Sequence, residues 1–198
     1  MPLPEIVSKP AVTHAQLDNL VKNRWSPRIF DQGHKLTDAE LESLGEAFRW
    51  APSAFNAQPW KLLLLSRGTE LHKELSAHGL SGFNQAWAPN ASAIGVILGA
   101  KSKPTGEELN AKNTAYDLGL ATMKLIMQAE SMGLKAHVMT GIFPEEISKV
   151  INAQDHWVMS LIAIGKQDTT EGQEEAIVER ENTPRERNAD SYLINQTL

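Results

Sequence analysis

The chain has 198 residues, of which 41% are apolar and 22% are charged, with a formal net charge of −5 and no cysteine. This composition is typical of a globular domain with a buried hydrophobic core, and we predict one domain over residues 1–198. Both charge signs are spread along the chain without a basic stripe, so we expect no nucleic-acid partner, and the lack of cysteine excludes disulfides, thiolate catalysis and thiolate metal sites.

Signals for export, membrane insertion and metal binding are missing from the sequence. Residues 1–5 lack the basic-then-apolar pattern of a secretion signal. The longest run of apolar residues and glycine, 93–100, is far shorter than the roughly 20 residues that a membrane-spanning helix requires. The histidines never show the spacing of a helical or strand metal pair. We therefore predict a cytoplasmic protein without a membrane segment or a metal site.

Two capping signals predict the first two helices. Thr13 is followed one helical turn later by glutamine, which predicts a helix that ends before Pro27. Thr37 is followed one turn later by glutamate, and apolar residues at helical spacing continue as far as Pro52. The second helix therefore leads directly into the proline-bounded segment 51–60.

The rest of the chain mixes helices and strands without strict alternation. The expected elements are, in order, a strand at 61–66, a helix at 70–78, an irregular connection at 79–89, a strand at 93–98, a long apolar helix at 107–132, a strand at 135–138, a helix at 144–151 and a strand at 157–165. This order favours the α+β class. Apolar residues become scarce beyond 166, so we predict an extended C-terminal arm over 166–198 that docks on the domain or on a second subunit.

The segment 51–60 sets small polar side chains between Pro52 and Pro59, which makes it a rigid polar loop. Such a loop suits contact with a flat polar ligand, because preset backbone angles lower the ordering cost of binding. The alternative is that Asn56 and Gln58 only cap the helix or bond their own backbone.

Two clusters of arginine indicate a phosphate site. Arg24, Ser26 and Arg28 alternate along the chain, so an extended backbone would place all three side chains on one face. Guanidinium groups suit phosphate oxygens, although a solvated or salt-bridged turn is the alternative interpretation. Arg185 and Arg187 repeat the alternation, which in isolation is more often a solvated edge, but together the two clusters could clamp a dianion.

The segment Arg24-Trp25-Ser26-Pro27-Arg28-Ile29-Phe30, followed by the loop 51–60, resembles the opening of the nitroreductase family of flavoproteins. Further resemblances are those of 117–121 and 129–134 to the central helix of the family, and of 161–165 to its last core strand. The resemblance covers about 21–187. It implies an α+β fold with a central, mostly antiparallel sheet surrounded by helices. It also implies an intertwined homodimer that binds FMN in two clefts between the subunits.

The resemblance further implies the residues that bind FMN. The phosphate and ribityl side of FMN would be held by Arg24, Trp25, Ser26 and Arg28. Arg185 or Arg187 would complete the phosphate contacts. Those implied for contact from the partner subunit are Pro52, Ser53, Ala54 and Asn56. Those implied for the polar edge of the flavin are Asn84 and the backbone N–H groups near Thr140 and Gly141.

The function that the resemblance implies is an FMN-dependent oxidoreductase. Hydride would pass from NADH or NADPH to flavin N5, and then to an acceptor such as a nitroaromatic compound or a quinone, in a ping-pong scheme. The cofactor carries this chemistry, so we expect no catalytic side chain. The alternative is a flavin-binding carrier or sensor in which Phe55 or the arm covers the reacting face.

Three further side chains need separate predictions. Asp117 lies on an apolar helix, and we expect it to bond a neighbouring group because an unpaired buried carboxylate is costly. Trp25 and Trp87 depart from the resemblance, since many members of the family carry arginine at the first position and some carry lysine near the second. Because these departures alter the charge near the flavin, we predict neither a redox potential nor a preference between NADH and NADPH.

Overall fold

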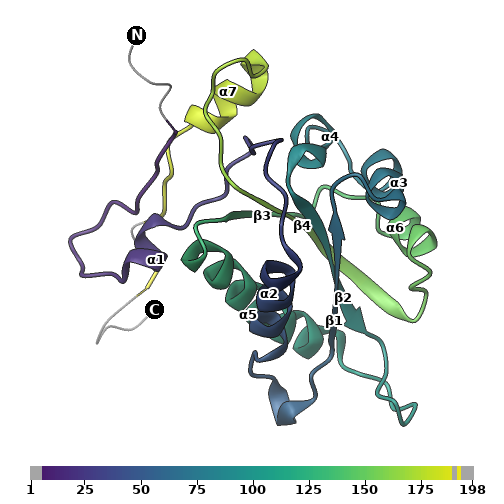
Figure 1. Ribbon diagram of the computed structural model, residues 1–198. Helices are drawn as coiled ribbons and strands as arrows, with labels where there is room; N and C mark the ends of the chain where they lie inside the picture. Colours follow the sequence, from purple (N-terminus) through teal and green to yellow (C-terminus); the bar gives the residue numbers. More distant parts are fainter. Residues whose placement is uncertain (1–5, 189–190, 193–198) are drawn as a thin grey trace.

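A four-stranded sheet forms the centre of the molecule in the computed structural model, which describes residues 6–188 and 191–192 (Figure 1). The strands are β1 (Trp60–Ser66), β2 (Ala93–Ala100), β3 (Lys135–Met139) and β4 (His156–Gly165). Their order is β1-β2-β4-β3, and each neighbouring pair is antiparallel. The predicted α+β class with an antiparallel sheet is therefore confirmed.

Helices cover both faces of the sheet (Figure 1). One face packs against α2 (Asp38–Arg49) and α5 (Ala111–Ser131), and the other packs against α3 (Glu70–His78), α4 (Asn84–Trp87) and α6 (Pro144–Val150). The central strands β2 and β4 are therefore buried on both sides, which explains their nearly continuous apolar sequence. Within the described residues no helix is long and apolar enough to cross a membrane.

Close packing of α5 on the sheet depends on glycine at one position of β2. A Cβ added at Gly99 would lie 2.8 Å from the side chain of Thr114 on α5. That separation is shorter than van der Waals contact, so a larger residue would push the helix away from the strand. The long apolar helix that we predicted is thus seated in the core.

The first predicted helix is wrong at its start. The helix α1 (Asn19–Asn23) is capped by Asp18, whereas the Thr13 hydroxyl accepts a hydrogen bond from the Ala15 N–H within a turn. The apolar residues of the predicted helical face stay accessible, with Val21 42% exposed. The Thr13 signal therefore closes a local turn instead of starting the helix. The capping box at Thr37 is present, as predicted.

Two boundaries in the middle of the chain also differ from the prediction. The connection 79–89 contains the short helix α4, which forms because Trp87 is completely buried in the core. The long helix begins at Ala111 rather than 107, with Asn110 as its cap. The residues just before it pair back on the chain, through a bridge between Ser102 and Glu108.

The C-terminal arm is folded onto its own domain over most of its described length. It contains a helix, α7 (Glu175–Asn182), so the prediction of an extended arm is wrong for this part. Gln167 bridges to Phe30, and Ile177 is buried in the core. Tyr192 is exposed, and the part of the predicted arm at 193–198 lies outside the described residues.

Candidate functional site

Six cationic side chains surround one cavity of about 380 Å³, which we call the cation cavity. They are Lys9, Arg24, Arg28, Arg180, Arg185 and Arg187. The cavity lies where the N-terminal segment and the C-terminal arm run side by side, drawn in purple and yellow (Figure 1). Segments from both ends of the chain therefore contribute positive charge to the same space.

The predicted alternation of the first cluster is present in the structure. Arg24, Ser26 and Arg28 all line the cavity, and Arg24 Nη1 donates to Ser26 Oγ over 3.2 Å. The segment is held from behind by two contacts. Glu181 Oε2 on α7 accepts a hydrogen bond of 2.7 Å from the Arg28 N–H, and His137 Nδ1 on β3 lies 2.9 Å from the Pro27 carbonyl. Both contacts fix the backbone that presents the arginines.

The second cluster closes the cavity from the arm. Arg185 and Arg187 both line it, so the structure brings the two clusters of the sequence together. Arg185 also donates through Nη1 to the carbonyls of Lys9 and Lys22, both at 3.1 Å. Arg187 Nη1 donates to the neighbouring Glu186 carbonyl. Arg185 therefore ties the arm to the N-terminal segment as well as contributing charge.

Burial, and then nearby like charge, lowers the pKa of Arg24 and Arg28 at the cavity. Burial is the main cause for Arg24, and the guanidinium groups of Arg185 and Arg187 lower its pKa further. Burial also lowers the pKa of Arg28, where the nearby Glu181 carboxylate opposes the effect. Among the described residues, none that lines the cavity is acidic. A bound anion would relieve this repulsion.

A carboxylate close to Arg28 is completely buried behind the arginines. Glu181 is 0% exposed, and burial raises its pKa. Its second oxygen, Oε1, has no hydrogen-bond partner among the described residues. A buried acceptor without a partner is costly, so its presence indicates a structural or functional role. Here its Oε2 holds the Arg28 backbone in place.

The residues predicted for the polar edge of the flavin lie together at the end of β3. Asn84 Nδ2 donates to the Gly141 carbonyl over 2.9 Å, and the Ser81 N–H donates to the same oxygen over 3.1 Å. Thr140 and Gly141 are both exposed. Arg180 connects this group to the cation cavity, because its guanidinium carbon lies 3.9 Å from the centre of the Phe83 ring.

The predicted loop residues Pro52, Ser53, Ala54 and Asn56 do not line the cation cavity. The Ala54 N–H instead donates to both carboxylate oxygens of the buried Asp117 on α5, at 3.3 and 3.2 Å. Asp117 therefore bonds a backbone group, as predicted. Ser53 Oγ accepts a hydrogen bond from the Gln58 N–H, so the loop is also stabilised by a contact within itself.

This loop presents an aromatic side chain to solvent in an unfavourable backbone conformation. Phe55, Asn56 and Gln58 have positive φ angles of 53°, 54° and 47°. Phe55 is fully exposed, whereas Gln58 Nε2 donates to the Asn56 carbonyl. The alternative that the loop bonds its own backbone is thus correct for Gln58. Non-glycine residues with such φ angles cost of order 1–3 kcal/mol each and concentrate at functional sites.

Sequence reasoning missed four residues of this site: Lys9, His137, Arg180 and Glu181. Lys9 and His137 are isolated in sequence and belong to no motif. Arg180 and Glu181 lie on α7, which we predicted as an extended arm. The one signal there is the helical spacing of Ile177 and Glu181, both of which face the domain interior.

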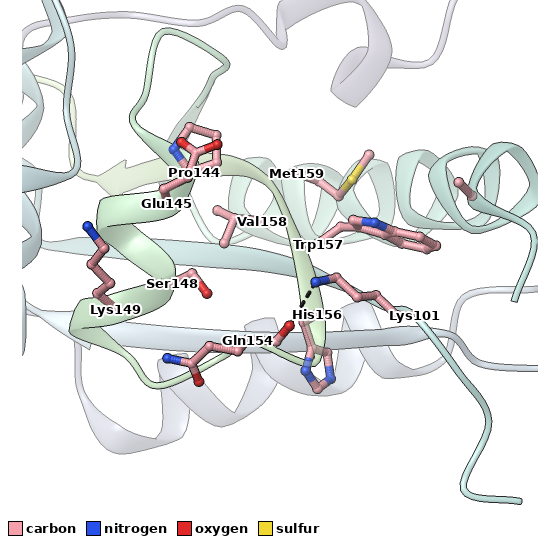
Figure 2. A pocket seen from close by; sticks show the side chains of 11 residues that line it. Lys101, Pro144, Glu145, Ser148, Lys149, Gln154, His156, Trp157, Val158 and Met159 are labelled. Carbon is pink, nitrogen blue, oxygen red and sulfur yellow. Dashed lines mark hydrogen bonds between the residues drawn. The ribbon is translucent and has the colours of Figure 1, made fainter. Parts of the chain in front are cut away.

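A larger cavity of about 600 Å³ lies between α6 and the start of β4 (Figure 2). Both of its lysines already have partners. Lys101 Nζ donates to the Gln154 carbonyl over 2.7 Å, and Lys149 pairs with Glu146 over 2.7 Å. None of the predicted site residues lines this cavity. The smaller cation cavity is therefore the candidate site.

Known proteins resemble this chain in sequence and in structure. The sequence model of the nitroreductase family matches residues 21–166. An oxygen-insensitive NADPH nitroreductase of Helicobacter pylori strain J99 is 33% identical over 88 residues, which cover 44% of this chain and 40% of that protein. That match therefore spans less than half of either protein.

Solved structures match over nearly the full length. A crystal structure of an oxidoreductase containing FMN is 30% identical, with a TM-score of 0.84, and the match covers 94% of this chain and 96% of that one. A nitroreductase family protein from Clostridium difficile 630 shares the fold, with 21% identity, a TM-score of 0.67 and coverage of 90% and 97%. The extent of the family match and of the FMN-containing structure leads to one conclusion: this chain belongs to the nitroreductase family.

Proposed function

We propose that this protein is an FMN-dependent oxidoreductase that takes electrons from NADH or NADPH and reduces an oxidised acceptor such as a nitroaromatic compound or a quinone. The observation that carries the proposal is the meeting of Arg24, Ser26, Arg28, Arg185 and Arg187 around one cavity. The related oxidoreductase of known structure contains FMN, and the Helicobacter pylori relative is named an NADPH nitroreductase.

The cation cavity fits the phosphate end of FMN. A phosphate monoester carries nearly two negative charges and accepts several hydrogen bonds, which matches converging guanidinium groups and a hydroxyl. Arg24, Ser26 and Arg28 would hold the phosphate from one wall, and Arg185 and Arg187 would close it from the arm. The lowered pKa of Arg24, caused by burial and by the two arm arginines, supports a site that needs an anion.

When bound, FMN supplies hydride transfer at its N5 atom. The side chains of the protein then serve to bind and orient the cofactor, and no acid or base is required. Asn84 and the backbone at Thr140 and Gly141 would face the polar edge of the ring. Asn84 is already fixed for this role by its hydrogen bond to the Gly141 carbonyl.

The proposal includes a homodimer in which each FMN is shared. The loop 52–56 does not line the cation cavity of its own chain, so a second copy would bring it to the flavin. An accessible groove of about 610 Å³, lined by Leu20, Pro52, Leu120 and Met123 among others, supports this arrangement. Exposed apolar surface of this kind marks interaction sites in proteins.

The test combines binding and reduction. Apoprotein is titrated with FMN and with riboflavin, which lacks the phosphate, and the FMN complex is then mixed with NADH or NADPH without oxygen. We expect the yellow colour to bleach. Arg28→Ala should weaken FMN binding roughly 10- to 100-fold, as expected for loss of a charge-assisted contact, and leave riboflavin binding unchanged.

The matched control is Arg49→Ala, which removes an exposed arginine of α2 that pairs with Glu46 outside the cavity. It should bind FMN like the wild type. Bound flavin that never bleaches would instead support a carrier or sensor. A folded protein that ignores FMN would contradict the proposal as a whole.

A further inference from the structure

The N-terminal segment 6–11 precedes the part of the chain that matches the family, yet it is attached to the site. Gln167 Nε2 donates to the Val7 carbonyl over 2.8 Å, and the Ala11 N–H donates to the Lys22 carbonyl over 2.7 Å. Both contacts involve the main chain of the segment. The segment therefore has a defined path beside α1 and the start of the arm.

This path places the side chain of Lys9 at the wall of the cation cavity. Its Nζ donates to the Thr183 carbonyl over 2.6 Å and lies 4.5 Å from the centre of the Trp25 ring. Arg185 Nη1 donates to the Lys9 carbonyl over 3.1 Å, which fixes the backbone of the lysine as well. An ammonium group has three N–H donors, so two remain after the contact with Thr183.

Lys9 lies among the charged residues of the cation cavity, which distinguishes it from a lysine on an open surface. Burial is the largest cause of the lowered pKa of Lys9. The Glu181 carboxylate opposes the shift, and the Arg28 guanidinium adds to it. Within the described residues, none of the ion pairs at hydrogen-bonding distance involves Lys9. A partly desolvated cation beside other cations is unfavourable unless an anion joins them.

We propose that Lys9 is a further phosphate-binding residue of the flavin site, contributed by a segment outside the family match. The inference rests on the proposed function, because the anion is taken to be the FMN phosphate. Lys9 would reach the phosphate across the cavity from Arg28, while its contact with Thr183 joins the N-terminal segment to the arm. The two ends of the chain then close the phosphate site together.

Replacement of Lys9 by glutamine tests this on the apoprotein, with flavin fluorescence quenching as the readout. We expect Lys9→Gln to raise the Kd for FMN about tenfold and to leave the Kd for riboflavin unchanged, because only FMN carries the phosphate. Lys9→Arg should restore most of the FMN affinity. The dependence of FMN affinity on salt should also become weaker in Lys9→Gln.

The matched control is Lys101→Gln, since Lys101 also donates to a backbone carbonyl at 2.7 Å but lies at the other cavity (Figure 2). It should bind both flavins like the wild type. Circular dichroism establishes that each variant is folded, and Lys9→Met serves as a second variant that keeps the apolar stem.

Three results would overturn the inference, and they have different meanings. Unchanged FMN affinity in Lys9→Gln and Lys9→Met shows that Lys9 does not contact the phosphate. Equal losses of FMN and riboflavin affinity show that Lys9 supports the fold of the site instead. A wild-type protein that binds neither flavin removes the proposed function itself, and this inference with it.

Discussion

His137 holds the arginine segment from β3 through a hydrogen bond to its backbone. Its Nδ1 lies 2.9 Å from the Pro27 carbonyl, and because a carbonyl can only accept, that nitrogen carries the proton. The ring packs against Trp87 with 4.5 Å between the centroids. Burial lowers the pKa of His137 to about 4, with the Pro27 bond opposing the shift and Arg28 and Arg24 adding to it. His137 is therefore neutral at pH 7.

This pKa predicts a pH dependence of stability. Between pH 6.5, the ordinary value, and about 4, the unfolded chain binds more protons than the folded one at His137. The contribution of His137 to the free energy of unfolding is thus complete above pH 6.5 and falls by about 3 kcal/mol as the pH is lowered through this window. Below about pH 4 it changes no further.

Urea unfolding of the apoprotein at several pH values measures the effect. We expect His137→Phe, which cannot titrate, to be less stable than the wild type at pH 7 and to lose less stability on acidification. The gap between the two proteins should narrow toward pH 4. His14→Phe, at an exposed position outside the site, is the control, and a gap that stays constant with pH would contradict the assignment.

At the scale of elements, α5 anchors the strained loop between α2 and β1. Asp117 is 3% exposed, and both of its oxygens accept from the Ala54 N–H at the start of the 3-10 helix η1 (Ala54–Asn56). The next residues, Phe55 and Asn56, have positive φ angles. Phe55 is fully exposed, so burial in its own chain does not offset this strain. The anchor therefore adds to the loop's internal hydrogen bonds in keeping it in place.

Loss of the anchor should cost stability without weakening the phosphate site. We expect Asp117→Ala to lower the free energy of unfolding by about 1–3 kcal/mol, because the Ala54 N–H loses its partner. Asp117→Asn keeps an acceptor oxygen and should lose less. Thermal unfolding and Kd measurements with inorganic phosphate separate the two effects. Equal stability of all three proteins would show that the contact contributes nothing.

At the scale of the whole molecule, the outer side of α5 leaves apolar surface accessible. Leu20, Leu120, Met123 and Met127 line the groove there together with Pro52, and Met123 is 42% exposed. The groove thus joins the long helix to the end of the helix that carries the predicted flavin loop. A second copy packed here would cover both, which is the arrangement proposed above.

A charge in this groove should therefore separate the subunits. Met123→Lys is expected to shift the protein from dimer to monomer in sedimentation velocity and to weaken FMN binding, because a shared cleft would be incomplete. The exposed position predicts little effect on the fold of each chain. Lys124→Gln, at the neighbouring groove position, is the control. A wild-type monomer that retains FMN would show that the cleft is not shared.

Local signals in the sequence determined much of the secondary structure and part of the site. The capping box at Thr37, the stop at Pro52 and the alternation of Arg24, Ser26 and Arg28 all depend on neighbours within a few residues. Such features follow from backbone geometry and short-range hydrogen bonds, which a single segment contains. The sequence also identified Arg185 and Arg187 as a second cluster, without showing where the arm would place them.

Only the tertiary structure decided how these pieces meet. The helix α4 forms because Trp87 is buried between distant elements, and α7 forms where the domain covers Ile177. Lys9 and His137 gained their roles from contacts with residues far away in the chain. Burial and electrostatic crowding depend on the summed positions of many segments, so neither the pKa of His137 nor the meeting of the N-terminal segment and the arm at one cavity is contained in any local pattern.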